Sequence, residues 1–128
     1  MSEHQMYERS LNALIRRRCR DLRLYHLGLT THRIPGYHDA GPGPAGYPDW
    51  TIVGPGGHLF REAKSENGRR SRAQIAWSKV LTAAGLDYDV WRPADWHSGR
   101  IDAELRAIAA PPPAAASALP EGRRHGLE

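Results

Sequence analysis

The chain has 128 residues, of which 40% are hydrophobic and 25% are charged, as is typical of a single soluble globular domain. It contains no apolar run near the roughly 20 residues of a membrane-spanning helix, and its polar first ten residues do not have the pattern of a signal peptide. Cys19 is the only cysteine, which excludes an internal disulfide and nearly excludes a zinc site built on thiolates. We therefore expect a protein without membrane association, in a reducing, cytoplasmic compartment.

Basic residues outnumber acidic ones by 18 to 14, which gives a net charge of +4. A mild positive excess favours a polyanionic partner such as nucleic acid, without establishing one. Arginine supplies almost all of the positive charge, because Lys64 and Lys79 are the only lysines. The position of a lysine in this chain is therefore unusually informative.

The first quarter of the chain predicts a helix over 2–20, with Ser2 and Gln5 at the spacing of a capping box. One face of this helix carries Leu11, Leu14, Ile15 and Arg18, and the other carries Arg16, Arg17 and Arg20. A short strand is predicted over 22–27. Residues 28–47 are rich in Gly, Pro and His, and loops of this length are often functional or mobile.

Two β-prone runs, 50–53 and 58–63, flank a Gly-Pro-Gly-Gly turn and predict a hairpin. A polar turn over 65–70 leads to a predicted helix over 71–84, which Gly85 ends, with a core of Ile75, Val80, Leu81 and Ala84. A strand over 88–91, ended by Pro93, and a helix over 98–109 that buries Ile101, Leu105 and Ile108 complete the pattern. We expect one α/β domain over 1–109, with a central mixed sheet flanked by helices 2–20 and 71–84, and a disordered Pro/Ala-rich tail over 110–128.

Three residues whose side chains are suited to catalysis or metal binding converge at the open end of the predicted hairpin. Asp49 and Glu62 are equally distant from its turn, so they become cross-strand neighbours with Cβ atoms roughly 5 Å apart. Side chains alternate along a strand, so Lys64 lies on the same face as Glu62. The spacing thus places two carboxylates beside one ammonium group.

Such a pair of carboxylates suits a hard divalent cation. Close carboxylates repel each other unless positive charge lies between them, and Mg²⁺ or Mn²⁺ prefers oxygen ligands. A bound cation polarises a phosphoryl oxygen and activates water, while Lys64 orients that water or stabilises charge on phosphorus. The alternative interpretation is a surface hairpin in which Lys64 merely pairs with Asp49 or Glu62, because this spacing is short enough to occur by chance.

The surrounding order of residues adds context to this spacing. Gly46-Tyr47-Pro48-Asp49-Trp50 is followed by Leu59-Phe60-Arg61-Glu62-Ala63-Lys64, Gly68-Arg69, Gln74, Trp77, Gly85 and Val90. This order resembles the VRR-NUC branch of the PD-(D/E)xK nucleases, particularly its small stand-alone members from phages and bacteria, over residues 8–96. The resemblance implies a restriction-endonuclease-like core. It also implies catalytic roles for Asp49, Glu62, Lys64 and Gln74, and an additional metal ligand in the Ala63 carbonyl. The segment before Asp49 is longer than the usual link of the family.

Nucleases of this superfamily often carry one more acidic residue on the first helix. The Glu-Arg-x-Leu-x-x-Leu-Ile pattern that starts at Glu8 is similar to that of archaeal Holliday-junction resolvases, so Glu8 is our first choice and Glu3 the second. The alternative for Glu8 is a solvated glutamate near a helix N-terminus. Gln74 also has a structural alternative, because Ser71 and Gln74 have capping-box spacing; the two roles are compatible. Trp77 fits the core better than a stacking platform.

Basic residues near the hairpin are candidates for phosphate contacts. Arg69, Arg70 and Arg72 precede a predicted helix N-terminus, a position that suits backbone phosphates; the alternative is a solvated basic turn. In the long loop, His32, Arg33 and Tyr37 are candidates for DNA contact. A zinc site at His32, His38 and Asp39 is disfavoured, because no second metal-binding motif frames them.

The resemblance implies a Mg²⁺- or Mn²⁺-dependent endonuclease that cleaves DNA phosphodiesters in a bacterial or phage-infected cell. Stand-alone relatives are associated with branched DNA and tend to dimerise, so we expect a Holliday-junction or flap substrate and a homodimer, which would bring two sites to two strands. The competing hypothesis is a DNA-binding or assembly module on a nuclease scaffold with weak or no cleavage. The sequence does not specify the DNA structure or sequence preferred, the oligomeric state, the pathway or the role of residues 28–47.

Overall fold

The computed structural model describes residues 6–28 and 45–112. Its elements, in chain order, are α1 (Glu8–Asp21), β1 (Tyr25–Gly28), β2 (Trp50–Gly54), β3 (Gly57–Ala63), α2 (Arg72–Ala83), β4 (Tyr88–Trp91), α3 (Pro93–His97) and α4 (Arg100–Ala109). The strands form one sheet in the order β1-β2-β3-β4, in which β1, β2 and β3 are antiparallel and β4 runs parallel to β3. The predicted α/β class with a mixed sheet flanked by helices is confirmed. No described helix has the length and apolar character needed to cross a bilayer.

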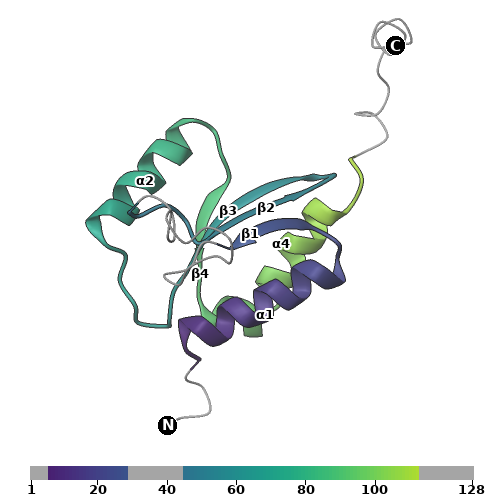
Figure 1. The fold of residues 1–128 in the computed structure, drawn as a ribbon, viewed down its shortest axis with the longest axis horizontal. Coiled ribbons are helices and arrows are strands. Elements are labelled where there is room, and N and C mark those ends of the chain that lie inside the picture. Colours follow the sequence, from purple (N-terminus) through teal and green to yellow (C-terminus); the bar gives the residue numbers. More distant parts are fainter. Residues whose placement is uncertain (1–5, 29–44, 113–128) are drawn as a thin grey trace, which may run out of the picture.

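The hydrophobic core lies on the sheet face that α1 and α4 cover (Figure 1). Alternation along the strands directs Trp50, Leu59 and Ala63 toward these helices. The helices contribute the buried side chains of Leu11, Ile15, Cys19, Ile101, Leu105 and Ile108. Full burial of a large aliphatic or aromatic side chain stabilises a fold by about 1.5–3 kcal/mol, so this face anchors the sheet.

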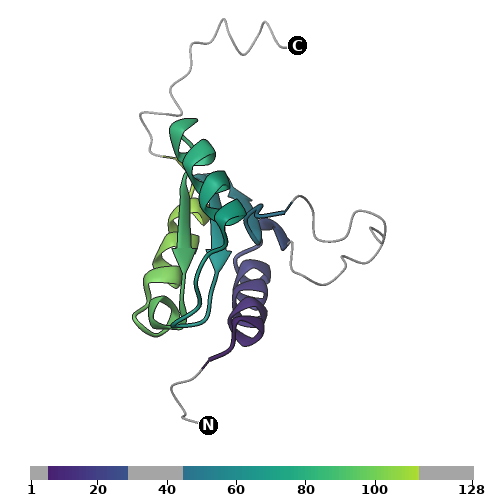
Figure 2. The same ribbon diagram turned by 90° about the vertical axis from the view of Figure 1, so that its left-hand side faces the viewer.

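Helix α2 covers the opposite face. Arg61 and Glu62 are neighbours in β3 and therefore point to opposite sides of the sheet. Arg61 contacts Glu104 of α4, whereas Glu62 contacts Gln74 of α2. Figure 1 shows α2 on one side of the sheet and α1 and α4 on the other, and in Figure 2 the side that carries α2 faces the viewer. The two carboxylates of the hairpin thus lie on the face away from the main core.

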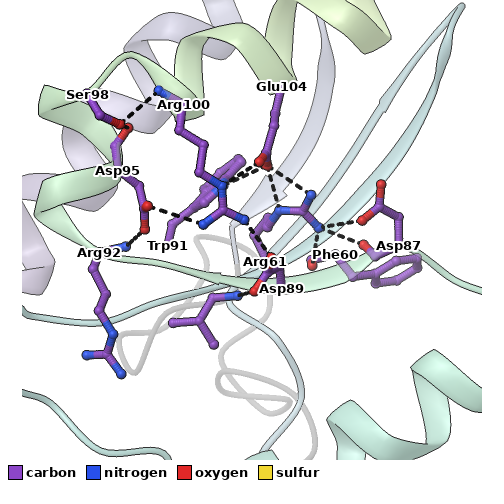
Figure 3. A network of polar contacts seen from close by, with 11 residues as sticks. Phe60, Arg61, Asp87, Asp89, Trp91, Arg92, Asp95, Ser98, Arg100 and Glu104 are labelled. Atoms are coloured by element: carbon purple, nitrogen blue, oxygen red, sulfur yellow. Dashed lines mark hydrogen bonds and ion pairs between the residues drawn. The ribbon is translucent and has the colours of Figure 1, made fainter.

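A charged network fixes β3 and β4 to α4 (Figure 3). The Arg61 side chain is 4% exposed, and its guanidinium contacts Glu104 at 2.9 Å and Asp87 at 3.1 Å. It also lies 5.4 Å from the ring centroid of Trp91, and Arg100 reaches the same Glu104 at 2.7 Å. Burial raises the pKa of Glu104, but hydrogen bonds from Trp91, Arg100 and Arg61 bring it below its ordinary value. The network holds β3 in place directly behind Glu62.

Two of the predicted N-terminal boundaries were wrong. The helix predicted over 2–20 begins at Glu8, because Tyr7 is extended (φ −74°, ψ 153°) and forms the N-cap without a side-chain hydrogen bond. The proposed cap formed by Ser2 and Gln5 lies outside the described residues. The strand predicted over 22–27 is shifted to Tyr25–Gly28, since Arg23 adopts a left-handed turn conformation (φ 57°). Arg18, predicted on the core face, contacts Asp102 at the edge of α4.

The hairpin and the second half of the chain agree better with the predictions. The hairpin turn, α2 and β4 are confirmed within a residue or two, and Ile101, Leu105 and Ile108 are buried as expected. The expected core face of α2 was wrong: Leu81 is buried, but Ile75, Val80 and Ala84 are exposed, because α2 lies over the thinly covered face of the sheet. The helix predicted over 98–109 is preceded by α3, which Pro93 begins. The predicted tail lies outside the described residues from 113 onward.

Candidate active site

The hairpin register brings Asp49 and Glu62 together. Trp50 pairs with Arg61 at the end of the β2–β3 ladder, so Asp49, one residue earlier, comes opposite Glu62. Asp49 is buried, and its Oδ2 accepts a hydrogen bond of 2.9 Å from the backbone N–H of Ala63. This bond closes the open end of the hairpin and fixes the Asp49 carboxylate beside the end of β3.

Glu62 is the most constrained polar side chain of the site. It is 1% exposed, and its Oε2 accepts a hydrogen bond of 2.8 Å from Nε2 of Gln74. Its Oε1 is also buried and accepts no hydrogen bond from a described donor group, but the Asp49 carboxyl lies close enough to share a hydrogen bond with Glu62 when one of the two carboxyls is protonated. An ionised buried carboxylate without enough donors is costly, so this pair needs either a shared proton or a positive charge between the two carboxyls.

Burial and mutual repulsion both favour protonation of the acidic pair. Burial raises the pKa of Glu62 to about 9, with the nearby charge of Asp49 adding to the effect. Burial likewise raises the pKa of Asp49, although a hydrogen bond with the Glu62 carboxyl and the one from the Ala63 backbone N–H oppose the shift. The positive charge of Lys64 lowers the pKa of both carboxyls, which shows that its ammonium group lies within electrostatic reach of the pair. A second, divalent positive charge would act in the same direction.

Gln74 forms the capping box considered from the sequence and also faces Glu62. At the start of α2, its Oε1 accepts a hydrogen bond from the Ser71 backbone N–H at 2.7 Å, and the Ser71 hydroxyl accepts one from its own N–H at 3.1 Å. The same side chain then donates through Nε2 to Glu62. The capping box therefore aims the amide at the carboxylate, and its orientation is fixed by hydrogen bonds on both ends.

Glu8 approaches the pair from the other side of the sheet. It lies in the first turn of α1, on the core-side helix, and yet the charges of Asp49 and Lys64 both act on it. Its pKa is raised, first by burial and then by the charge of Asp49. Glu8 nevertheless lies too far away to complete a cluster: among the described residues, no three His, Cys, Asp or Glu side chains are grouped closely enough to hold a metal ion. Glu3 lies outside the described residues.

The basic turn after β3 leads to α2, whose first turn carries Gln74. Arg69 and Arg72 are exposed, and Arg70 is half-buried with its Nη1 3.5 Å from the Tyr88 hydroxyl. Sequence reasoning missed the residue that shapes this turn. The Arg92 guanidinium donates to the backbone carbonyls of Ser65 at 2.7 Å and Gly68 at 2.8 Å, and no spacing rule links Arg92 to a turn so far away in sequence.

A second residue missed from the sequence is Asn12. It is buried on α1, one turn after Glu8, and its Oδ1 accepts a hydrogen bond of 2.7 Å from Nε1 of Trp50. Because Trp50 directly follows Asp49, this bond ties the helix that carries Glu8 to the strand that carries Asp49. A polar residue on an otherwise apolar helix face was the available signal.

Trp77 belongs neither to the core nor to an open stacking surface. Its side chain is half-buried; its Nε1 donates to the Ala45 carbonyl at 3.1 Å, and its ring meets Tyr47 edge to face. The prediction that it packs in the core was therefore wrong. Instead, Trp77 holds the segment before Asp49 against α2. The long-loop candidates Arg33, His32, Tyr37, His38 and Asp39 all lie outside the described residues.

The site as a whole is an acidic pair with one hydrogen-bond donor from α2, a nearby ammonium group and exposed arginines after the strand. Comparison of the chain with protein-family models, with curated proteins and with solved structures finds no match. The function is therefore inferred from the chemistry of these side chains.

Proposed function

We propose that the protein is a metal-dependent endonuclease that hydrolyses DNA phosphodiester bonds, with the PD-(D/E)xK type of core that its sequence resembles in the VRR-NUC nucleases. The observation that carries the proposal is the buried pair of Asp49 and Glu62, whose carboxyls lie close enough to repel each other when ionised, with Glu62 Oε2 held by Gln74. A buried acidic pair that forms no ion pair with a described Lys or Arg side chain is costly in its ionised form unless a cation lies between the carboxyls.

The donor set fits a hard divalent cation. Asp49 and Glu62 offer carboxylate oxygens, which Mg²⁺ and Mn²⁺ prefer, and Mg²⁺ commonly binds through one or two carboxylates while keeping several waters. The Ala63 carbonyl is the third proposed protein ligand. When bound, the ion would supply Lewis acidity toward a phosphoryl oxygen and lower the pKa of a water molecule.

The chain's own residues account for orientation and charge. Gln74 holds the Glu62 carboxylate in one rotamer through its amide. Lys64 lies half-buried just beyond β3, where its ammonium group would stabilise negative charge that develops on the phosphoryl oxygens. Glu8, in the first turn of α1, would accept hydrogen bonds from water bound near the pair. Arg69, Arg70 and Arg72 would bind backbone phosphates beside the scissile bond.

The substrate class and assembly follow from the resemblance and stay proposals: branched DNA such as a Holliday junction or flap, cut by a homodimer. A dimer would bring one site to each of two DNA strands, whereas a single domain carries only one site. Sedimentation of the purified chain with and without four-way-junction DNA tests the assembly.

The test of the function is a cleavage panel of single-stranded, duplex, flap and four-way-junction DNA with Mg²⁺, Mn²⁺ or EDTA. We expect cleavage that depends on the metal and is lost in Glu62→Gln, which keeps the size of the side chain but removes its charge. Lys79→Gln, a single-charge change on an exposed position of α2, is the matched control and should cut normally. Metal-independent cleavage, or equal activity in both variants, would contradict the proposal.

One observation favours the competing function, a DNA-binding or assembly module without cleavage: the described residues contain no group of three potential ligands. Under that hypothesis the chain binds DNA but leaves every substrate of the panel intact with either metal. Titration of Mn²⁺ monitored by its electron paramagnetic resonance signal separates the two cases, because the module needs no bound ion.

A further inference from the structure

A row of arginines on α1 is not used by the site described above. Arg9, Arg16 and Arg20 are spaced by seven and four residues, which returns each to the same side of a helix. Arg9 and Arg20 are exposed and Arg16 is half-buried. We call these three residues the α1 strip. No carboxylate of a described residue lies within 4.0 Å of any of the three guanidinium groups, whereas Arg18 on another side of the helix contacts Asp21 and Asp102.

The location of the α1 strip follows from one contact and from its place on the helix beside Glu8. The Arg16 guanidinium lies 5.2 Å from the ring centroid of Trp50 in β2, so the strip borders the sheet on the side away from Asp102 and α4. Arg9 directly follows Glu8, which senses the charges of Asp49 and Lys64. The strip therefore starts near the candidate site and continues along α1 for about 16 Å, from the helical rise of about 1.5 Å per residue.

The acidic residues of the domain are distributed unevenly. Four carboxylates gather with Arg61 and Arg100 where β3, β4, α3 and α4 meet (Figure 3), namely Asp87, Asp89, Asp95 and Glu104. Asp102 of α4 is occupied by Arg18 and Arg106. This concentration of paired charge on the α4 side leaves the net positive charge of the described chain on the α1 side and at the turn after β3.

We propose that the α1 strip binds the phosphate backbone of double-stranded DNA outside the cleavage site. The inference rests on the proposed function for the identity of the polyanion. With a rise of about 3.4 Å per nucleotide along one strand, the strip spans about five nucleotides. Arg69, Arg70 and Arg72 lie beyond the opposite face of the sheet, so a duplex held by both basic regions passes across the end of the hairpin where Asp49 and Glu62 meet. Backbone contacts of this kind set position and orientation rather than sequence preference.

The experiment measures the binding of a fluorescent 20-base-pair duplex by anisotropy between 50 and 200 mM salt, in EDTA so that no strand is cut. The test variant is Arg9→Gln with Arg20→Gln; Arg16 is kept because it packs on Trp50. The matched control is Lys79→Gln with Arg106→Gln, which removes the same charge from exposed positions on α2 and α4. Circular dichroism checks that each variant is folded.

We expect the test variant to lower the slope of log K against log salt by up to about 1.8, which is about 0.9 for each of two lost phosphate contacts, while the control keeps the wild-type slope. Arg9→Lys with Arg20→Lys should restore the slope, since lysine also binds phosphate as a point charge. Equal slopes in the test and control variants would overturn the α1 strip as a DNA surface, whatever the cleavage panel shows. Wild-type protein that fails to bind duplex at 50 mM salt would overturn it too. Binding is measured in EDTA, where no strand is cut, so a failure of the catalytic proposal appears in the cleavage panel and leaves the slopes unaffected.

Discussion

The Nε2 of Gln74 donates to Oε2 of Glu62 at 2.8 Å, and the other end of the same amide accepts the backbone N–H of Ser71. One side chain thus joins the N-terminus of α2 to a carboxylate in β3. The cap fixes the position of the amide, and the amide fixes one oxygen of Glu62. The other oxygen accepts no hydrogen bond from a described donor group.

The two functions of Gln74 can be separated by mutation. Ser71→Ala removes the cap and should lower the free energy of unfolding by about 0.5–2 kcal/mol, with little change in the single-turnover rate of DNA cleavage. Gln74→Glu keeps an oxygen for the cap but replaces the amide donor to Glu62 by a carboxyl group, so it should reduce the rate far more than its loss of stability accounts for. Urea denaturation and single-turnover kinetics give both quantities. A cleavage rate that follows stability alone in the two variants would assign Gln74 to the cap and nothing more.

The metal-free protein should lose stability as pH rises. The pKa of Glu62 is about 9 in the folded chain, against an ordinary value of 4.5, so between these values the folded state holds a proton that the unfolded chain has released. The contribution of Glu62 is fully present below pH 4.5 and falls by roughly 1 kcal/mol per pH unit as pH rises toward 9. Glu62→Gln should flatten this part of the profile, as measured by urea denaturation in EDTA.

Metal binding should reverse that trend. The cation requires deprotonated carboxylates, so binding releases protons and strengthens with pH. We expect Mn²⁺ to raise the melting temperature of the wild-type protein more at pH 8.5 than at pH 6, and to leave that of Glu62→Gln unchanged at both. An equal rise in both proteins would place the ion elsewhere.

The hydrogen bond between Trp50 and Asn12 should carry measurable coupling. Asn12→Ala leaves the buried indole N–H unsatisfied, which costs about 1–3 kcal/mol. Trp50→Phe removes the donor, so adding Asn12→Ala to it should cost less than in the wild-type background. Urea denaturation of the four proteins of this cycle gives the coupling energy. Strictly additive losses would show that Asn12 does not hold α1 to β2 through this bond.

The hairpin part of the site could be predicted because it depends on local rules. Alternation and the Gly-Pro-Gly-Gly turn fix the register, and the register alone brings Asp49 to Glu62. Ser71 and Gln74 likewise follow from the spacing of a capping box. Each of these inferences needs only residues close in sequence or paired across one turn.

The parts that could not be predicted depend on tertiary packing. Periodicity identified α2 but assigned Ile75 and Val80 to the core; it reports amphipathicity and not how completely a sheet face is covered. Trp77 was misplaced for the same reason. Arg92 is 24 residues from the Gly68 carbonyl that it holds, and Asn12 is 38 residues from its partner Trp50, so no sequence pattern connects them.

Lys64 gives the sharpest test of the candidate site. It is one of only two lysines among 18 basic residues, it follows β3 directly, and its charge acts on Glu62, Asp49 and Glu8. No carboxylate of a described residue lies within 4.0 Å of its ammonium group, by contrast with the ion pairs of Arg61 and Arg100. An ammonium group held near, but not bound to, an acidic pair suits a developing phosphoryl charge better than a structural salt bridge.

Lys64→Ala should therefore lower the single-turnover rate on the order of 100-fold or more, by analogy with the loss of one oxyanion donor. DNA affinity should change little, because one cation among many basic residues is a small part of the electrostatic total. Lys64→Arg should rescue the rate poorly, since the guanidinium is planar, larger and unable to release its proton. If Lys64 merely formed a surface ion pair, its loss would be worth about 0–1 kcal/mol of stability and would leave the rate unchanged. Cleavage and affinity of the two variants under Mg²⁺ distinguish these cases, and a folded Lys64→Ala protein that cuts at the wild-type rate would remove Lys64 from the mechanism.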